Sequence, residues 1–315
     1  MSTLDAIDTC LLRLTESMEG SLQSDSLQIW NELESVATDL LKRAILDGSD
    51  GETNRAWHLK TVASTRTTYL TSFQLMRSGK YYEAWCKLEE AEISLISLKR
   101  NRIYQSSEFA VDTLAKMVKN WQSLYPYAVF MSPEFAIKRE ECSICGLVVD
   151  PWSDCKHEPG IVYRGKECYR IVKTAELLGM SLVPDPVQKY SVPFIKNDQG
   201  ERHDHYDYTV VSFVVDRLRS AVSGWTPTWT KAYHPHELFK DIGPEDGCPC
   251  GSGRQYGNCC NSNRGVLRPH IEIEFDERPS ALLPNVTLAG YKERLSSEKS
   301  TWVDSRESDS QSNNV

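Results

Sequence analysis

The sequence predicts a mixed α+β chain, with an N-terminal helical bundle, a mixed middle region and a cysteine-rich knuckle near the C-terminus. Apolar residues recur every three to four positions through the first 130 residues, which is typical of amphipathic helices. Beyond that point this periodicity fades, and Gly, Pro, Cys and β-branched residues become frequent. Eight of the ten cysteines fall in two windows, residues 142–168 and 248–260.

The helical region divides into five amphipathic segments. Gly79 is expected to end the third helix as a C-cap, and Pro126 follows the fifth. The hairpin at Gly79 resembles a tetratricopeptide repeat, but it is a single copy and arrays usually need about three. A plain bundle is therefore predicted. The defining positions are Leu4, Ile7, Leu11 and Leu14; Trp30, Leu33, Leu40 and Leu41; Leu59, Val62, Tyr69, Phe73 and Met76; Tyr81, Trp85, Leu88, Leu95 and Leu98; and Val111, Leu114, Val118, Trp121 and Tyr125.

The rest of the chain is expected to hold short strands and irregular segments. Strands are predicted at 147–149, 161–163, 181–183 and 209–215, and the last segment could equally begin a helix that runs to Ser220. The predicted organisation is a helical domain (1–131), a zinc-binding segment of three cysteines and one histidine with short strands (132–196), a mixed connecting region (197–246), a cysteine knuckle (247–265), and a short strand with a disordered acidic tail (266–315).

Composition limits the classes of function. The 315 residues are 40% hydrophobic and 25% charged, which is ordinary for a globular chain long enough for more than one domain. The formal net charge is −8, whereas non-specific nucleic-acid binding requires a basic surface. The charge balance therefore argues against a general DNA- or RNA-binding protein, and it leaves a local basic patch as an open alternative.

The opening segment MSTLDAIDTC lacks the basic and apolar regions of a signal peptide. No stretch approaches the roughly 20 apolar residues that cross a bilayer. We therefore expect no membrane insertion and a cytoplasmic location, where thiols stay reduced. Clustered cysteines in that setting are more often metal ligands than disulfide partners.

The first cysteine window, residues 142–157, reads CSICGLVVDPWSDCKH. Two thiolates separated by two residues can fold round one ion, and Gly146 lets the backbone turn afterwards. The Cys-x-His pair that follows would complete a closed tetrahedral zinc site, and a redox Cys-x-x-Cys does not explain that pair. Cys168 could replace His157 as the fourth ligand. The candidate ligands are Cys142, Cys145, Cys155 and His157.

The second window, residues 247–261, reads GCPCGSGRQYGNCCN. Pro249 stiffens the bend between two cysteines that must face one ion. Gly251 and Gly253 allow the following turn, because glycine reaches positive φ at low cost. Zinc would supply the stability that some twenty residues cannot obtain from a core. The candidate ligands are Cys248, Cys250, Cys259 and Cys260.

This second window resembles the SEC-C motif, which occurs at the C-terminus of the preprotein translocase ATPase SecA and on many other bacterial proteins. The preceding HPHELFKDIGPEDG looks like the lead-in of such modules, with His234 and His236 as packing or capping residues. The resemblance implies a zinc ion on the four cysteines, contact with a protein partner and a bacterial source. The fixed positions present are Cys248, Pro249, Cys250, Gly251, Ser252, Gly253, Tyr256, Cys259 and Cys260.

In the translocase ATPase the module docks a chaperone and touches the ribosome through basic residues. This chain has few lysines there, so the resemblance does not imply a strongly acidic partner. Arg264 and Arg268 are expected to restore some positive charge. The residues where lysines are frequent in the family are here Arg254, Gln255, Gly257 and Asn258.

One further cluster suggests an enzyme. His203 and His205, with Asp207, could bind a catalytic metal. A polar surface segment in which Asp207 caps the following helix is the favoured interpretation. Trp225 and Trp229 are expected to be loop aromatics that cover the knuckle or form an exposed contact patch.

The sequence thus predicts a non-enzymatic chain with two structural zinc ions that acts as an adaptor or docking protein for unidentified protein partners. One alternative is a metal-dependent enzyme with a site within residues 160–240. Another is a nucleic-acid-associated protein whose zinc knuckles contact phosphate.

Overall fold

The computed structural model describes residues 27–47, 50–101, 111–197 and 199–276. The predicted first helix around Leu4–Leu14 and the polar tail lie outside these residues. The chain forms two compact units. The first comprises Met1–Tyr125, Phe130–Pro193 and Tyr208–Gly224, and the second comprises Pro126–Val129, Phe194–Asp207 and Trp225–Val315. Helices and small antiparallel sheets together confirm the predicted α+β class.

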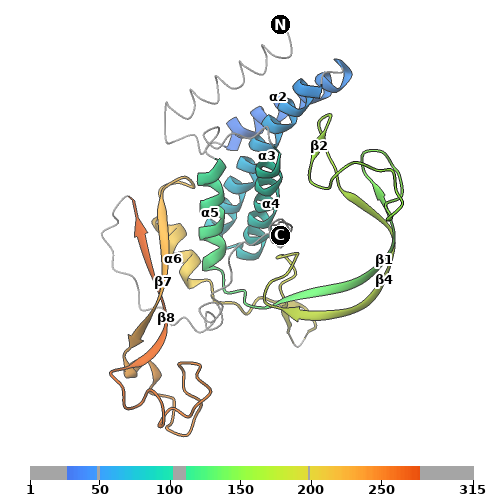
Figure 1. Cartoon of the computed structure of the whole chain (residues 1–315). Helices are drawn as coiled ribbons and strands as arrows, with labels where there is room; N and C mark the ends of the chain where they lie inside the picture. Colours follow the sequence, from blue (N-terminus) through green and yellow to red (C-terminus); the bar gives the residue numbers. More distant parts are fainter. Residues whose placement is uncertain (1–26, 48–49, 102–110, 198, 277–315) are drawn as a thin grey trace, which may run out of the picture. The chain divides into compact units, whose positions relative to one another are not determined.

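Helices dominate the first unit, and α2, α3 and α4 lie side by side (Figure 1). Acidic residues in the first turn of α3 and Arg77 in its last turn complement the helix dipole. The four helices that the periodicity predicted within the described residues are confirmed. Their bounds are α2 (Leu27–Asp47), α3 (Asp50–Arg77), α4 (Tyr81–Arg100) and α5 (Val111–Leu124), and the unit adds α6 (Thr209–Arg217).

The turn between α3 and α4 is built around Gly79, whose φ is +74°. Its N–H donates to the carbonyl of Met76 at 3.0 Å, and the N–H of Lys80 donates to the carbonyl of Leu75 at 2.9 Å. These two bonds are the Schellman pattern that satisfies the last carbonyls of a helix. The predicted C-cap is confirmed.

The core of this unit is aromatic. Tyr69 and Trp121 are fully buried, and the indole N–H of Trp121 donates to the Tyr69 hydroxyl at 3.3 Å. That hydroxyl donates to the carbonyl of Ala221 at 2.7 Å, which fastens the segment after α6 to α3. Buried hydroxyl and indole groups thus obtain the hydrogen bonds that burial requires.

A buried histidine in α3 gives this unit a predictable acid sensitivity. His58 is 4% exposed, and burial lowers its pKa to about 4 from the ordinary 6.5. Between these values the unfolded chain binds a proton that the folded chain excludes. The free energy of unfolding should therefore fall by about 3 kcal/mol as pH drops from 6.5 to 4.

Urea unfolding across this pH range tests the effect. His58→Gln should lose that part of the slope relative to wild type, while His205→Gln, a change at an exposed histidine, should retain it. Equal slopes for wild type and His58→Gln would show that His58 does not titrate as its burial requires. Acid also displaces metal from cysteine ligands. The contribution of His58 is therefore measured as the difference in slope between wild type and His58→Gln.

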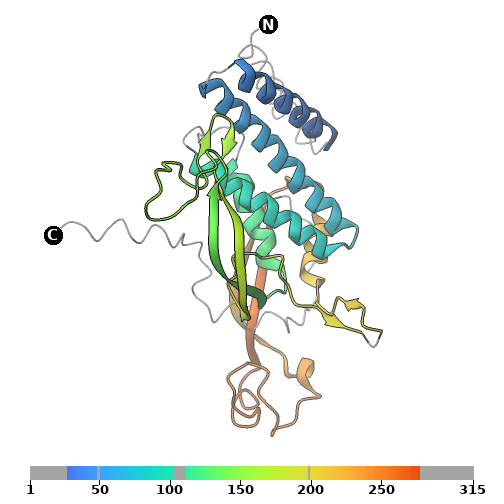
Figure 2. The same ribbon diagram turned by 90° about the vertical axis from the view of Figure 1, so that its right-hand side faces the viewer.

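A long two-stranded ribbon leaves the helices. Strands β1 (Phe130–Cys142) and β4 (Arg170–Val183) pair antiparallel with register shifts after Glu134, Ile137 and Arg139. Such bulges increase twist and bend a ribbon, and both views show it curved (Figures 1 and 2). The residues between the two strands contain Cys145, Cys155 and His157 of the first cysteine cluster and the β2–β3 hairpin (Val162–Tyr163 and Lys166–Glu167), while Cys142 ends β1.

The base of the ribbon is fastened to α4 and α5. The Lys189 ammonium contacts both carboxylate oxygens of Glu92 at 2.6 and 2.7 Å and the side-chain carbonyl of Gln122 at 3.3 Å. The indole of Trp85 donates to the Lys189 carbonyl at 2.6 Å, and the Lys189 N–H donates to the Glu89 carboxylate at 2.5 Å. The chain leaving β4 is therefore held by partly buried polar bonds.

The second unit contains two antiparallel pairs. Strands β7 (Trp225–His234) and β8 (Val266–Phe275) pair along their whole length, and β5 (Ile195–Lys196) pairs with β6 (Arg202–His203). The 3₁₀ helix η2 (His236–Phe239) follows β7 and leads into the second cysteine window. That window therefore lies in the connection between β7 and β8.

Several strand predictions need correction. Residues 209–215 belong to helix α6, so the helical alternative holds there. Residues 181–183 are only the end of the 14-residue β4, and 147–149 contribute a single bridge between Val148 and Glu141. The 161–163 strand is confirmed in part by β2. Trp225 and Trp229 lie in β7 rather than in a loop.

None of the described helices combines the length and apolar character that spanning a membrane requires.

Candidate metal centres

Four ligand atoms converge in the first cluster. The Sγ atoms of Cys145 and Cys155 lie 3.7 Å apart, and Nδ1 of His157 lies 3.8 Å from Sγ of Cys155. With Cys142, all four ligand atoms lie within 4.8 Å of one another. Two sulfurs bound to one zinc ion at about 2.3 Å in a tetrahedron would lie about 3.8 Å apart. The cluster therefore has the donors and the spacing for a zinc ion.

The backbone turn after β1 prepares this cluster. Cys142 is the last residue of β1, and the Gly146 N–H donates to its carbonyl at 2.8 Å, with Gly146 at φ +72°. Burial raises the pKa of the Cys142 thiol, but hydrogen bonds from the backbone N–H groups of Cys145 and Ile144 outweigh burial and lower that pKa to about 6. Cys142 is thus disposed to be a thiolate, the form that binds metal.

The segment that follows the first cluster and leads into β2 is fastened to the helices by Asn101 at the C-terminal end of α4. Its amide donates to the carbonyls of Ser97 and Gly160 at 2.7 and 3.0 Å, and its side-chain carbonyl accepts the Val162 N–H at 2.9 Å. A Cβ added at Gly165 would lie 2.6 Å from side-chain atoms of α2 and α3. The β2–β3 hairpin therefore packs closely on the bundle.

An arginine accompanies this cluster. Arg170 donates through Nη1 to the sulfur of Cys155 at 3.8 Å and through Nη2 to the carbonyl of His157 at 3.1 Å. Three thiolates around a divalent ion carry a net negative charge, which this guanidinium is placed to offset. Such outer contacts orient ligands and tune a metal site.

Four sulfurs converge in the second cluster. Sγ of Cys259 lies 3.6 Å from Sγ of Cys250 and 4.0 Å from Sγ of Cys260. With Cys248, the four sulfurs lie within 4.8 Å of one another. This set also matches tetrahedral zinc, because four thiolates satisfy all of its positions.

Local turns explain this geometry. Gly251 and Gly253 have φ of +80° and +74°, so the backbone reverses where the sequence predicted. Burial raises the pKa of the Cys250 thiol, but hydrogen bonds from the side chains of Ser252 and Cys248 outweigh it and lower that pKa to about 6. A thiolate is therefore favoured at this ligand position near neutral pH.

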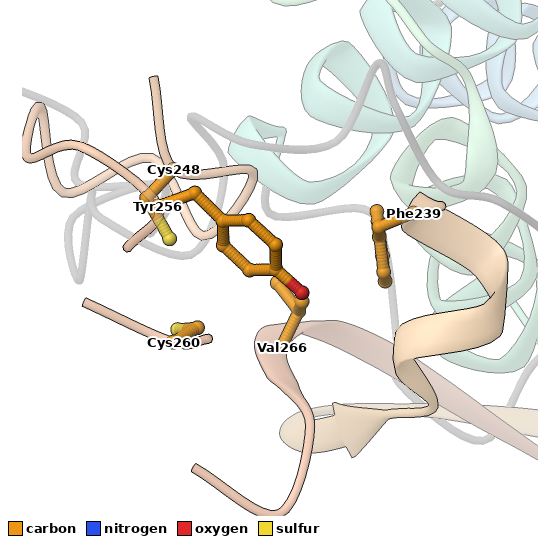
Figure 3. Packing of buried hydrophobic residues seen from close by; sticks show 5 residues of the cluster. All are labelled: Phe239, Cys248, Tyr256, Cys260 and Val266. Atoms are coloured by element: carbon orange, nitrogen blue, oxygen red, sulfur yellow. The ribbon is translucent and has the colours of Figure 1, made fainter. Parts of the chain in front are cut away.

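A small core lies beside these sulfurs. Tyr256 lies between the cysteines and the side chains of Phe239 and Val266 (Figure 3). Its hydroxyl contacts Nδ1 of His236 at 2.5 Å, while Nε2 of His236 lies 2.8 Å from the Asn263 carbonyl. Because a carbonyl only accepts, Nε2 of His236 carries a proton and donates it to Asn263.

This core extends the module in both directions. Phe239 comes from η2 and Val266 from the start of β8, so the lead-in and the following strand belong to the same packed unit. The sequence interpretation named the lead-in and expected His236 to pack or cap, but it missed Phe239 and Val266. Their apolar character next to a cysteine window is the signal that was available.

Other residues singled out in the sequence lie elsewhere. Within the described residues, the two cysteine-containing clusters are the only groups of three or more metal-binding side chains whose ligand atoms come together. His203, in β6, and His205 are exposed, and they are not brought together with Asp207 as a metal group. Helix α6 has Tyr208 as its N-cap, which corrects the expected cap at Asp207.

The module exposes less positive charge than the sequence predicted. Arg268 is 8% exposed, and its guanidinium lies 5.6 Å from the Phe239 ring centroid. Burial lowers its pKa, while the Cys250 thiolate acts in the opposite direction. Arg268 is therefore an internal cation near the sulfurs, and Arg254 and Arg264 remain the exposed arginines of the module.

Comparisons with known proteins agree with this geometry over one segment. Residues 246–262 match the sequence model of the SEC-C motif, which covers all four cysteines of the second cluster. No curated protein and no solved structure matches the chain. The first cluster lies outside the matched residues. The chain thus carries a SEC-C motif at residues 246–262, together with a separate cysteine–histidine cluster able to hold a second metal ion.

Proposed function

We propose that this protein binds two structural zinc ions and that the scaffold they stabilise docks protein partners. The observation that carries the proposal is the closed donor set at each centre. The proposed ligands are Cys142, Cys145, Cys155 and His157 at one centre and Cys248, Cys250, Cys259 and Cys260 at the other.

Closed sites favour a structural role over catalysis. A catalytic zinc keeps one coordination position for water or substrate, whereas four protein ligands occupy every position of a tetrahedral ion. Each proposed centre offers four ligand atoms within 4.8 Å. We therefore infer that the zinc ions stabilise the surrounding structure and take no part in a reaction.

The surface of the SEC-C module suits contact with a protein. Over residues 247–265 the exposed residues are mostly polar and uncharged, including Ser252, Gln255 and Asn258, with Arg254 and Arg264 as the exposed cations of this stretch. Two arginines are a weak electrostatic footprint for nucleic acid. A partner with a polar surface of low charge is the better match.

The ribbon offers a second contact surface, which we call the apolar face. The register places Phe135 opposite Leu177 and Pro133 opposite Met180, so these side chains share one face. Contiguous exposed apolar surface of this kind marks interaction sites. Its large exposed members are Phe135 (52%), Ile137 (53%), Leu177 (58%), Met180 (63%) and Leu182 (69%).

Charges on the ribbon are mostly paired within it. Lys138 contacts Glu176 at 3.4 Å, and Lys173 contacts Glu141 at 3.2 Å. These cross-strand pairs leave little unbalanced charge to attract a charged ligand, so an apolar surface on another protein is the partner that fits the apolar face.

Affinity purification from the native host tests the proposal with matched variants. Cys259→Ser/Cys260→Ser should lose partners held by the module, and Leu177→Lys should lose partners held by the apolar face. Ser181→Lys adds the same charge to the opposite face of the ribbon and should retain all partners. If all variants stay folded and recover the same proteins as wild type, the docking proposal is wrong.

A further inference from the structure

A fourth sulfur, and thus a fifth potential ligand, lies at the first centre. Cys168 follows β3, is 1% exposed, and its Sγ lies 3.8 Å from Sγ of Cys142. That separation matches the 3.7 Å between Cys145 and Cys155. It is also the distance of about 3.8 Å that two sulfurs on one zinc ion would have.

The backbone holds Cys168 in place. Its N–H donates to the carbonyl of Ile161 at 2.9 Å, and its carbonyl accepts the N–H of Gly160 at 2.6 Å. Gly160 is also bonded to Asn101 at the end of α4. The Cys168 sulfur is therefore fixed beside Cys142 by the same contacts that dock the hairpin on the bundle.

His157 is the one nitrogen ligand of the first cluster, and it is less buried than Cys142. Its ring packs edge-on against Tyr163 with the centroids 4.6 Å apart, and it is half-buried. Cys142 and Cys168, in contrast, are both buried. The cluster thus combines a buried sulfur pair with a more accessible imidazole.

We propose that the first centre is a five-donor site in which the Cys168 thiolate can take the position of His157, converting a ligand set of three sulfurs and one nitrogen into one of four sulfurs. The Cys168 thiol gives up its proton, and the released imidazole can accept it, so the exchange needs no other reactant. Arg170, beside Cys155, is placed to offset the added negative charge. This inference rests on the proposal that the first cluster binds metal.

Cadmium-113 NMR of the full chain tests it, since the chemical shift depends on the number of sulfur ligands. Wild type should show two bound ions. His157→Ala should keep both, with the first-centre signal in the four-sulfur range. Cys168→Ser should also keep both, and each single change should weaken first-centre affinity less than about tenfold. The double variant should lose more than about 100-fold, beyond the effect of an outer-shell change.

The alternatives give different results. If His157→Ala alone loses the first ion as completely as the double variant, Cys168 does not substitute and the five-donor proposal is wrong. If wild type binds a single ion, metal binding at this cluster is itself wrong. Cys86→Ser, on α4 and outside the cluster, is the cysteine control. Should the double variant fail to fold, the shift of His157→Ala decides: four sulfurs support the inference, and three overturn it.

Discussion

Removing zinc is expected to unfold the SEC-C module, including its lead-in and the start of β8. The small core around Tyr256 includes ligands Cys248 and Cys260 themselves, so few apolar contacts remain when the sulfurs separate. Structural zinc in small modules contributes on the order of 10 kcal/mol near neutral pH. Hydrogen exchange should therefore show loss of amide protection over residues 236–266 after chelation.

The same experiment contains its own reference. Amides of α3 and α4, which surround a large aromatic core, should keep their protection in the chelated chain. Cys250→Ser should reproduce the loss without chelator, and the neighbouring change Ser262→Ala, at an exposed site, should not. Unchanged protection over 236–266 after complete metal removal would show that the module folds without zinc.

Lys189→Met is expected to lower the free energy of unfolding of the first unit by about 3–5 kcal/mol. Lys189 is the cation bonded to Glu92, whose side chain is 8% exposed, and its backbone N–H bonds Glu89. Burial already raises the pKa of Glu89. Without the ammonium, negative charge stays buried beside an apolar side chain, which is far costlier than losing a surface ion pair.

Urea unfolding followed by far-ultraviolet circular dichroism measures this effect. Lys87→Met removes the lysine of an exposed pair with Glu90 at 2.6 Å and should cost less than about 1 kcal/mol. A loss for Lys189→Met no larger than that of the control would contradict the assigned role. A larger loss would support the view that this lysine fastens the base of the ribbon.

The helices were predictable because the pattern that identifies a helix lies within neighbouring residues of the sequence. Apolar spacing of three to four residues placed α2 to α5, and Gly79 marked a turn that the structure closes with two backbone bonds. The ribbon strands β1 and β4 were not predictable in this way. Their middle portions lack a buried face, and the bulges near Glu134 and Ile137 break the two-residue alternation that identifies a strand.

The clusters were predictable for the same reason. Spacing alone selected two sets of four residues whose ligand atoms the fold brings within 4.8 Å. The spacing could not predict which other residues lie near each group of four ligands. The sequence named Cys168 as an alternative to His157. Its position beside Cys142, 26 residues away in the chain, requires the fold of the β2–β3 hairpin, which Asn101 holds. Likewise, the burial of Arg268 follows from the β7–β8 pairing.

The most direct test of the two-zinc scaffold is elemental analysis of the purified full chain, combined with an accurate protein concentration. The account predicts two zinc ions per chain in wild type. It predicts one in Cys259→Ser/Cys260→Ser and one in Cys142→Ser/Cys145→Ser, each variant having lost half of one ligand set. Wild-type protein prepared without chelators that holds one zinc or none would contradict the account.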